Sequence, residues 1–277
     1  MSTHPLLLCA RQELLLALRS RWTQTFAIVF AALSLAVAGS GYILSGGRGV
    51  QDFSRTGASL VQLVLLLVPL TALVIGVLSV APDRGMTELL FSQPVARKTI
   101  LWGKLLGLFA ALAGAEALGF GAAGLVIFSQ AGDQGLSGFL LLLGAAFALT
   151  LVFLALAAVL AVGSGGRRSR GLALALVVWF ITVVLFDLGA LGLASLLPSG
   201  AASRVLILTV LVNPVDAVRT GALLGIEGTA AFGSASLAFF RFTRGPTNAA
   251  LLISFSLLAW IVVPSLVAGR RLRNADL

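Results

Sequence analysis

The sequence predicts an all-α membrane protein with six transmembrane helices. Of its 277 residues, 59% are hydrophobic and only 10% are charged, whereas soluble domains carry about 25% charged residues. The mean hydropathy is +1.07, and six apolar runs reach the roughly 20 residues that a helix needs to cross a bilayer core. So few charges cannot cover the surface of a soluble domain of this size, and a single soluble domain is therefore excluded.

Hydropathy places the six spans along the whole chain. The spans are Thr23–Leu44, Leu60–Ala81, Leu105–Phe128, Phe139–Val162, Leu172–Leu197 and Ala249–Ala268. Four contain no charged residue, whereas the third contains Glu116 and the fifth contains Asp187, both near mid-span. A single transmembrane domain over residues 1–277 is therefore expected.

Lysine and arginine are distributed unequally between the two sides. Thirteen lie in the two termini and in the loops on the same side of the membrane as the termini. Six lie in the loops on the opposite side of the membrane. Because cytoplasmic loops carry the positive excess, both termini should be cytoplasmic, in a multi-pass protein of the bacterial inner membrane. The net charge of +9 then reflects topology and attraction to anionic lipids, and no nucleic-acid partner is expected.

Ahead of the first span, Pro5–Arg21 is predicted to be a helix. Leu7, Leu14 and Leu18 share one stripe of it, and polar residues occupy a different sector. A helix lying on the cytoplasmic membrane interface fits this pattern best. The alternative is that the segment extends the first span.

Small residues recur every four positions along the third span. They are Gly103, Gly107, Ala111, Ala115, Gly119 and Ala123. This spacing lets helix backbones approach closely, as in GxxxG packing. Packing within the chain accounts for the pattern, and dimerisation through the same face is the alternative.

The connection Pro198–Asn248 is too long for a plain loop. It contains the apolar run Val205–Val212 and the helix-like Val215–Ile226, separated by Asn213-Pro214. Neither piece is long enough to span, so both are predicted to be short helices at, or dipping into, the outer face. A seventh span starting near Gly221 would break the even count that the basic C-terminus requires.

The rare residues exclude several kinds of chemistry. The chain has one cysteine, one histidine and two methionines, so neither a clustered metal site nor a Ser-His-Asp triad inside the membrane is expected. The phosphate-binding pattern GxxxxGK[ST] is absent from the sequence. An intramembrane enzyme is thereby nearly excluded, and the chain is expected to bind no cofactor.

The loop Ala81–Lys104 concentrates charge in a protein with little cytoplasmic mass. Asp83-Arg84 and Glu88 mark the start of a short helix, Leu89-Leu90-Phe91 form an apolar patch, and Pro94 ends it. A short helix with an apolar tip is suited to docking a cytosolic partner. The alternative is an interfacial loop whose apolar residues touch lipid.

This loop resembles that of ABC-2 type transporter permeases. The matching residues are Gly85-x-Thr87-Glu88-Leu89-Leu90-x-Ser92-x-Pro94-Val95-x-Arg97, followed by Ile100-Leu101-x-Gly103-Lys104. The N-terminal Ala10-Arg11-x-Glu13-Leu14 and the six-span layout are similar to that family as well. One departure is that Ala81-Pro82-Asp83-Arg84 holds a single carboxylate where the family often has an acidic cluster, so that cluster's contacts are not carried over.

Within the family, the motif Asn213-Pro214-Val215-Asp216-Ala217-x-Arg219 resembles the permease of the nitrous-oxide-reductase maturation system. In that system a periplasmic partner docks on the outer side, and assembly of the enzyme's copper–sulfur cluster is supported. The residues implied to meet the outer partner are Asn213, Pro214, Asp216 and Arg219.

The resemblance implies a division of labour. Two permease copies would form the membrane core, and two separate cytoplasmic ATPase subunits would use ATP and Mg. The implied ATPase-coupling residues are Asp83, Arg84, Gly85, Glu88, Leu89, Leu90, Phe91, Pro94 and Arg97. Because copper requires soft or imidazole ligands, this chain is predicted not to coordinate copper; export of a sulfur species or mechanical transmission stays open.

Glu116 and Asp187 are costly inside a membrane, and no basic residue lies within any predicted span to pair with them. One interpretation is a proton or solute pathway, or a polar hinge in the dimer. The other is a protonated or hydrogen-bonded group, with Thr150, Thr182 or a backbone carbonyl as partner. For the whole chain, the alternative to a permease is an ATP-independent secondary transporter or channel with six spans, which inverted repeats would support.

Overall fold

The computed structural model describes residues 5–45, 50–81, 96–131, 136–165, 167–227, 239 and 241–274. Within these ranges all regular structure is helical, which confirms the all-α class. Six helices within the described ranges are long and apolar enough to cross a membrane, as predicted. They are α2 (Arg21–Ser45), α3 (Val50–Val80), α5 (Arg97–Ala131), α6 (Leu136–Gly163), the fifth span Arg168–Ser195, and α12 (Pro246–Asn274).

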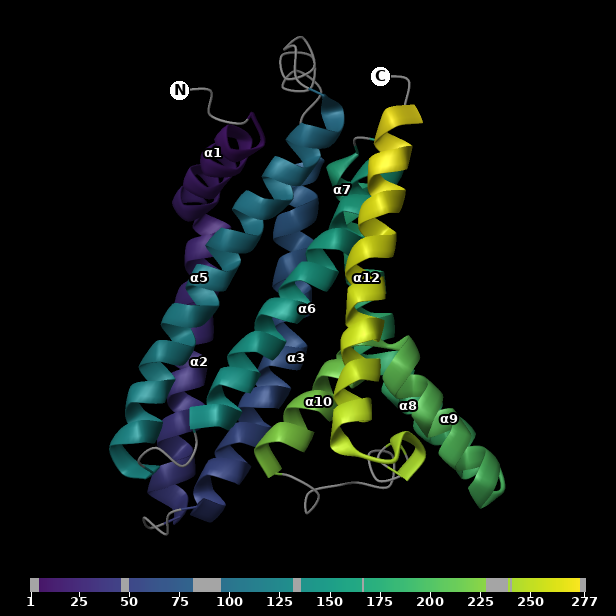
Figure 1. The fold of residues 1–277 in the computed structure, drawn as a ribbon. Coiled ribbons are helices and arrows are strands. Elements are labelled where there is room, and N and C mark those ends of the chain that lie inside the picture. The colour runs from purple at the N-terminus through teal and green to yellow at the C-terminus, as the bar shows by residue number, and fades with distance from the viewer. Residues whose placement is uncertain are drawn as a thin grey trace.

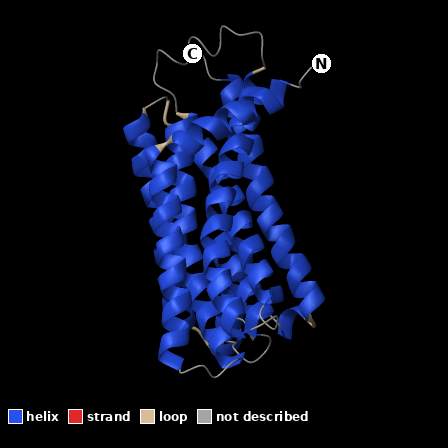
Figure 2. Ribbon diagram, turned by 90° about the vertical axis from the view of Figure 1, so that its left-hand side faces the viewer, coloured by secondary structure: helices blue, strands red, loops and turns tan. Residues whose placement is uncertain are grey.

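The helices form one bundle, with α1 (Pro5–Arg19) and the C-terminal end of α12 at the same end (Figures 1 and 2). We call this the terminal end. The α5 helix already begins at Arg97, ahead of the apolar run predicted from Leu105. Hydropathy marks only the apolar part of a helix, so it misses turns that carry charge.

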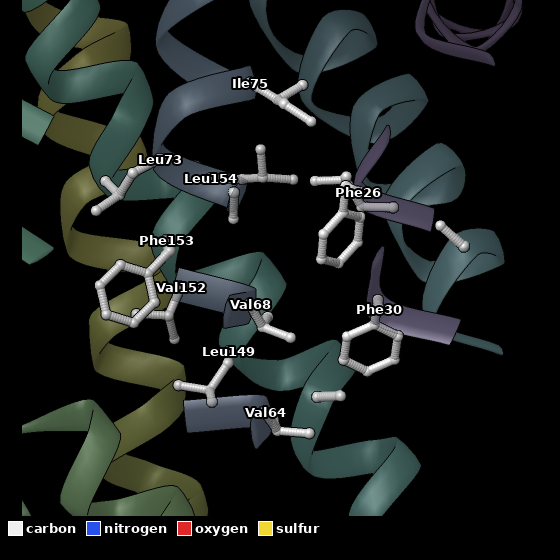
Figure 3. Packing of buried hydrophobic residues seen from close by; sticks show 14 of the residues in the cluster. Phe26, Phe30, Val64, Val68, Leu73, Ile75, Leu149, Val152, Phe153 and Leu154 are labelled. Atoms are coloured by element: carbon white, nitrogen blue, oxygen red, sulfur yellow. The ribbon is translucent and has the colours of Figure 1, made fainter. Parts of the chain in front are cut away.

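The core lies where α3, α5 and α6 meet, and α6 contributes buried residues along its whole length. Figure 3 shows Val64 and Val68 of α3 facing the interior shared with Leu149 and Phe153 of α6. Aromatic rings continue this core. The rings of Phe120 and Phe30 lie 5.2 Å apart and nearly perpendicular, an arrangement that aromatic pairs favour.

The small-residue face of α5 packs against helices of the same chain. A Cβ added at Gly119 would lie 2.6 Å from a ring carbon of Phe30 on α2, and one at Gly103 would lie 2.5 Å from the Cβ of Cys9 on α1. Such distances require a shift of the neighbouring atoms. Packing within the chain, as predicted, is therefore confirmed, and these positions are already occupied by α1 and α2.

The helix α1 is separated from α2 at Ser20 and lies against α5. The N-terminal segment therefore does not simply extend the first span. Its placement on the membrane interface stays a prediction.

The fifth span consists of α7 (Arg168–Phe180), the π-helical segment η2 (Ile181–Leu185) and α8 (Phe186–Ser195). Two short helices follow at the end of the bundle opposite the terminal end: α9 (Ser199–Val212) and α10 (Pro214–Glu227). They are bent by 99° at their junction, which confirms two helices in this connection.

Candidate functional sites at the two ends of the bundle

Residues 82–95, which hold most of the predicted ATPase-coupling residues, lie outside the described part of the chain. The predictions for Asp83, Arg84, Gly85, Glu88, Leu89, Leu90, Phe91 and Pro94 are therefore not placed. Of that set, Arg97 is described, and it is the first residue of α5. The positions that flank this loop, at the end of α3 and the start of α5, are described in detail.

Three helices meet at the terminal end through Glu13, Ser79 and Lys104, which we call the Glu13 cluster. The Ser79 hydroxyl donates a hydrogen bond to Glu13 Oε1. Lys104 Nζ lies 3.7 Å from Glu13 Oε2 and donates to the Ser79 carbonyl oxygen over 2.9 Å. Glu13 is 7% exposed, so this carboxylate of α1 is buried between α3 and α5.

Two glycines explain how α1 comes so close to α5. A Cβ added at Gly107 would lie 2.7 Å from the Cβ of Glu13, and one at Gly103 would lie 3.1 Å from the Leu6 carbonyl oxygen. Glycine at both positions lets the two backbones approach until the Glu13 side chain contacts both Lys104 of α5 and Ser79 of α3. The four-residue repeat predicted close packing here, but not which helix would pack.

Residues of α7 also contact the end of α3. Arg168 Nε donates to the Ala81 carbonyl oxygen over 2.9 Å. A Cβ added at Gly171 would lie 2.8 Å from Val77 Cγ1, so α7 and α3 approach closely at this level. The segment that leads into residues 82–95 is thus contacted by side chains from α1, α5 and α7.

Glu116 lies in the core between α5 and α6. It is 1% exposed, and Thr150 donates to its Oε1 over 2.5 Å. Its Oε2 has no hydrogen-bond partner within the described chain. The predicted hydrogen bond to Thr150 is confirmed, and the site joins α5 to α6.

A second polar site lies at the opposite end and consists of Thr182, Asp187, Asn213, Asp216 and Arg219, which we call the Arg219 cluster. Arg219 Nη1 lies 2.6 Å from Asp187 Oδ2 and 2.9 Å from Asp216 Oδ1. Asn213 Nδ2 donates to Asp216 Oδ2 over 3.1 Å and to the Thr182 carbonyl oxygen over 2.8 Å. These contacts attach α10 to the fifth span.

The local sequence explains this geometry. Asn213 has extended backbone dihedrals that end α9, and its Oδ1 accepts a hydrogen bond from the Val215 amide over 3.1 Å, as an N-cap side chain does. Pro214 occupies the first helical position, where its missing N–H costs nothing. Thr182 lies in the π-helical segment η2, a type of irregularity that occurs often at functional sites.

Two residues of α12 complete the junction. Ser256 donates to the Leu211 carbonyl oxygen over 2.6 Å, and Trp260 Nε1 donates to the Val212 carbonyl oxygen over 3.1 Å. The last carbonyls of a helix have no partner within it. These side chains supply one, which is what a helix ending among apolar neighbours requires.

The expectation that Asp187 lacks a basic partner is wrong. Arg219 reaches it because the bend between α9 and α10 returns the chain to the fifth span. Asn213 and Asp216, predicted to meet an outer partner, are 2% and 6% exposed and turn toward their own chain.

The residues that pair at the terminal end were missed, although Glu13 is the single acidic residue ahead of the first span. No group of three or more metal-ligand residues is present in the described ranges.

Comparison with known proteins identifies the family. The family described as "ABC-2 family transporter protein" matches residues 7–277. The chain is 35% identical to "Probable ABC transporter permease protein NosY" of Pseudomonas aeruginosa over 235 residues, 83% of this chain and 85% of that protein. It is 37% identical to the protein of the same name in Stutzerimonas stutzeri over 265 residues, 94% of each chain. The chain therefore belongs to the ABC-2 transporter family and is a multi-pass membrane permease.

Proposed function

We propose that this chain is the non-catalytic permease subunit of an ABC transporter and couples ATP hydrolysis in a separate ATPase to events across the membrane. The observation that carries the proposal is the family match over residues 7–277, on a chain whose sequence has no GxxxxGK[ST] loop. Two copies of the chain, as one transmembrane domain each, assemble with two ATPase subunits. ATP and Mg belong to the ATPases.

Coupling is assigned to the loop 82–95 together with Arg97. Glu88, Leu89, Leu90 and Phe91 seat in a groove of the ATPase. Support comes from the rigid surroundings of the loop, because both helices from which it emerges are tied to neighbours at the terminal end. Movement of the ATPases then swings the two permeases as rigid bodies. The terminal end faces the cytoplasm of a bacterial inner membrane, in agreement with the excess of lysine and arginine there.

The cellular role we propose is the maturation of nitrous oxide reductase. The two curated relatives named NosY support this, as does the motif Asn213–Arg219. A periplasmic accessory protein docks on the outer helices α9 and α10, which the Arg219 cluster fixes to the fifth span. Copper itself is not coordinated along the membrane path, because soft and imidazole ligands are scarce. Stoichiometric tight copper on the purified permease would overturn that last point.

Affinity purification tests the coupling assignment. An ABC-type ATPase is expected to co-purify with the tagged wild-type permease from its own host membranes. Charge reversal Glu88→Lys, or deletion of Leu89–Phe91, should reduce its recovery at least ~10-fold, equivalent to about 1.4 kcal/mol of binding free energy. The control is the reversal Arg204→Glu on α9, which should leave recovery unchanged.

Retention of the ATPase in both loop variants would refute the coupling assignment. Absence of any ATPase from the wild type, with substrate flux that persists without ATP, would instead support the six-span secondary transporter or channel.

A further inference from the structure

The loop 82–95 begins where α3 ends, and that end is unusual in how it is held. The last carbonyls of any helix lack partners within the helix. Here the carbonyl of Ser79, in the last turn of α3, and that of Ala81, the residue after α3, accept hydrogen bonds from the cationic side chains of Lys104 and Arg168. Cations at a helix C-terminus also meet the negative end of its dipole. The end of α3 is thus capped by residues of two other helices, α5 and α7.

The buried carboxylate of Glu13 adds a third helix to this arrangement. It receives the Ser79 hydroxyl bond and lies beside Lys104. Glu13 is the one carboxylate among the side chains that the structure describes at the terminal end. The other charged side chains described there are basic. A carboxylate that is buried with its partner loses most of its stabilisation if the partner is removed. The α1 helix is therefore bound to α3 and α5 through its charge as well as through its backbone contact at Gly107.

An interfacial helix that merely rests on lipid needs no such contacts. Here the end of α3 contacts Glu13 of α1 through Ser79, and it contacts α7 through Arg168. A displacement of this end would therefore displace both contacts. The start of α5 takes part in the same contacts, because Lys104 lies in the second turn of α5. The end of α3 is therefore connected to α1 and to the fifth span by side-chain contacts, and the start of α5 is connected to α1 and to the end of α3.

We propose that Glu13, Ser79, Lys104 and Arg168 are positioning residues. They hold the end of α3 against α1 and α7, and the start of α5 against α1 and the end of α3, so that movement of the loop 82–95 reaches α1 and the fifth span together. This inference rests on the proposed function, because it assigns the route by which an ATPase bound at the loop moves the membrane helices. Removing these contacts uncouples the helices from the loop without removing the loop's own contact with the ATPase.

The test uses the full permease–ATPase complex in lipid nanodiscs. Cys9→Ala removes the single native thiol of this chain, and Arg204→Cys on α9 carries a spin label in each of the two copies. The distance between labels is measured by pulsed electron paramagnetic resonance, without nucleotide and with ATP–Mg–vanadate. Variants are Glu13→Gln, Lys104→Met, Ser79→Ala, Arg168→Gln and the conservative Lys104→Arg, which keeps a cationic donor. Lys98→Met, an exposed lysine on the same helix, is the matched control.

The wild type and Lys98→Met should show a nucleotide-dependent change in the distance between labels. Glu13→Gln, Lys104→Met and Arg168→Gln should lose most of that change while they retain the ATPase, and Ser79→Ala should lose part of it. Lys104→Arg should retain the change, because a guanidinium can still donate to the Ser79 carbonyl oxygen and pair with Glu13. A purely structural role would lower thermal stability alone and leave the change intact in every complex that assembles.

The inference is overturned if any assembled variant that removes the charge of Glu13, Lys104 or Arg168 changes distance as the wild type does. It is also overturned if Lys104→Arg loses the change as Lys104→Met does. If the variants that remove a charge fail to assemble, the inference is overturned when Ser79→Ala changes distance as the wild type does. Failure of the proposed function gives a different pattern: the wild type itself binds no ATPase, or shows no response to nucleotide.

Discussion

Arg219 of α10 lies 2.6 Å from Asp187 of the fifth span, measured from Nη1 to Oδ2. The same nitrogen lies 2.9 Å from Asp216, so one guanidinium compensates two carboxylates that are partly or wholly withdrawn from solvent. Its Nε is buried without a hydrogen-bond partner in the described chain. The connection between the last two spans is therefore fixed by charge as well as by apolar packing.

Removing the cation should destabilise the protein more than removing one of its partners. Arg219→Met leaves both carboxylates uncompensated, whereas Asp187→Asn leaves the Arg219–Asp216 pair in place. Because Arg219 and Asp187 keep 25% and 31% of their side-chain surface exposed, we expect roughly 1–3 kcal/mol for Arg219→Met, less than for fully buried pairs. Thermal unfolding in detergent measures this. Equal losses in the two variants would contradict the shared-cation arrangement.

Asn213 should be replaceable neither by alanine nor by aspartate. Asn213→Ala removes the acceptor for Val215 and the donor to Thr182, for a loss of about 1–2 kcal/mol. Asn213→Asp keeps the acceptor but brings a third carboxylate beside Asp216. Unfolding of both variants is compared with Asn248→Ala, which removes the amide that donates to the Thr243 carbonyl. If Asn213→Asp were as stable as the wild type, the hydrogen bonds that the Asn213 amide donates would not contribute to stability.

Alanine at Gly107 should separate α1 from α5. The added Cβ would lie 2.7 Å from that of Glu13, and overpacking of this kind costs about 1–3 kcal/mol. Gly121→Ala on the same helix, where nothing lies within 4 Å of the added Cβ, is the control and should be neutral or slightly stabilising. Limited proteolysis near residue 20 should become faster in Gly107→Ala alone. Similar rates in the two variants would show that α1 does not depend on this approach.

Glu116→Gln should fold and assemble normally. The side chain keeps its shape and an oxygen to accept from Thr150, so the change in unfolding free energy should stay within about 1 kcal/mol. Thr150→Val, which withdraws the hydrogen bond that the carboxyl group receives from Thr150, should cost more. Nitrous oxide reductase maturation in cells then decides the role of Glu116. Lost maturation with intact assembly assigns the carboxyl group to a proton or solute pathway, and full activity rules that pathway out.

The sequence predicted the elements better than the contacts between them. Apolar length was enough for the six spans, and Asn213-Pro214 was enough for the division into α9 and α10. The pairing of Arg219 with Asp187 joins residues 32 positions apart and depends on the 99° bend, which no local pattern specifies. Likewise, the small-residue repeat on α5 predicted close packing, but its partners α1 and α2 are set by tertiary structure.

Photo-crosslinking at the loop tests the central claim most directly. Phe91 is replaced by a benzophenone amino acid in the full-length permease, expressed in its own host, and crosslinked products are identified by mass spectrometry. The same substitution at Leu196, an exposed residue at the far end of the bundle, is the control. The account predicts a crosslink from position 91 to an ATPase that carries a GxxxxGK[ST] loop, and none from position 196. Crosslinks from position 91 to lipid alone would contradict it.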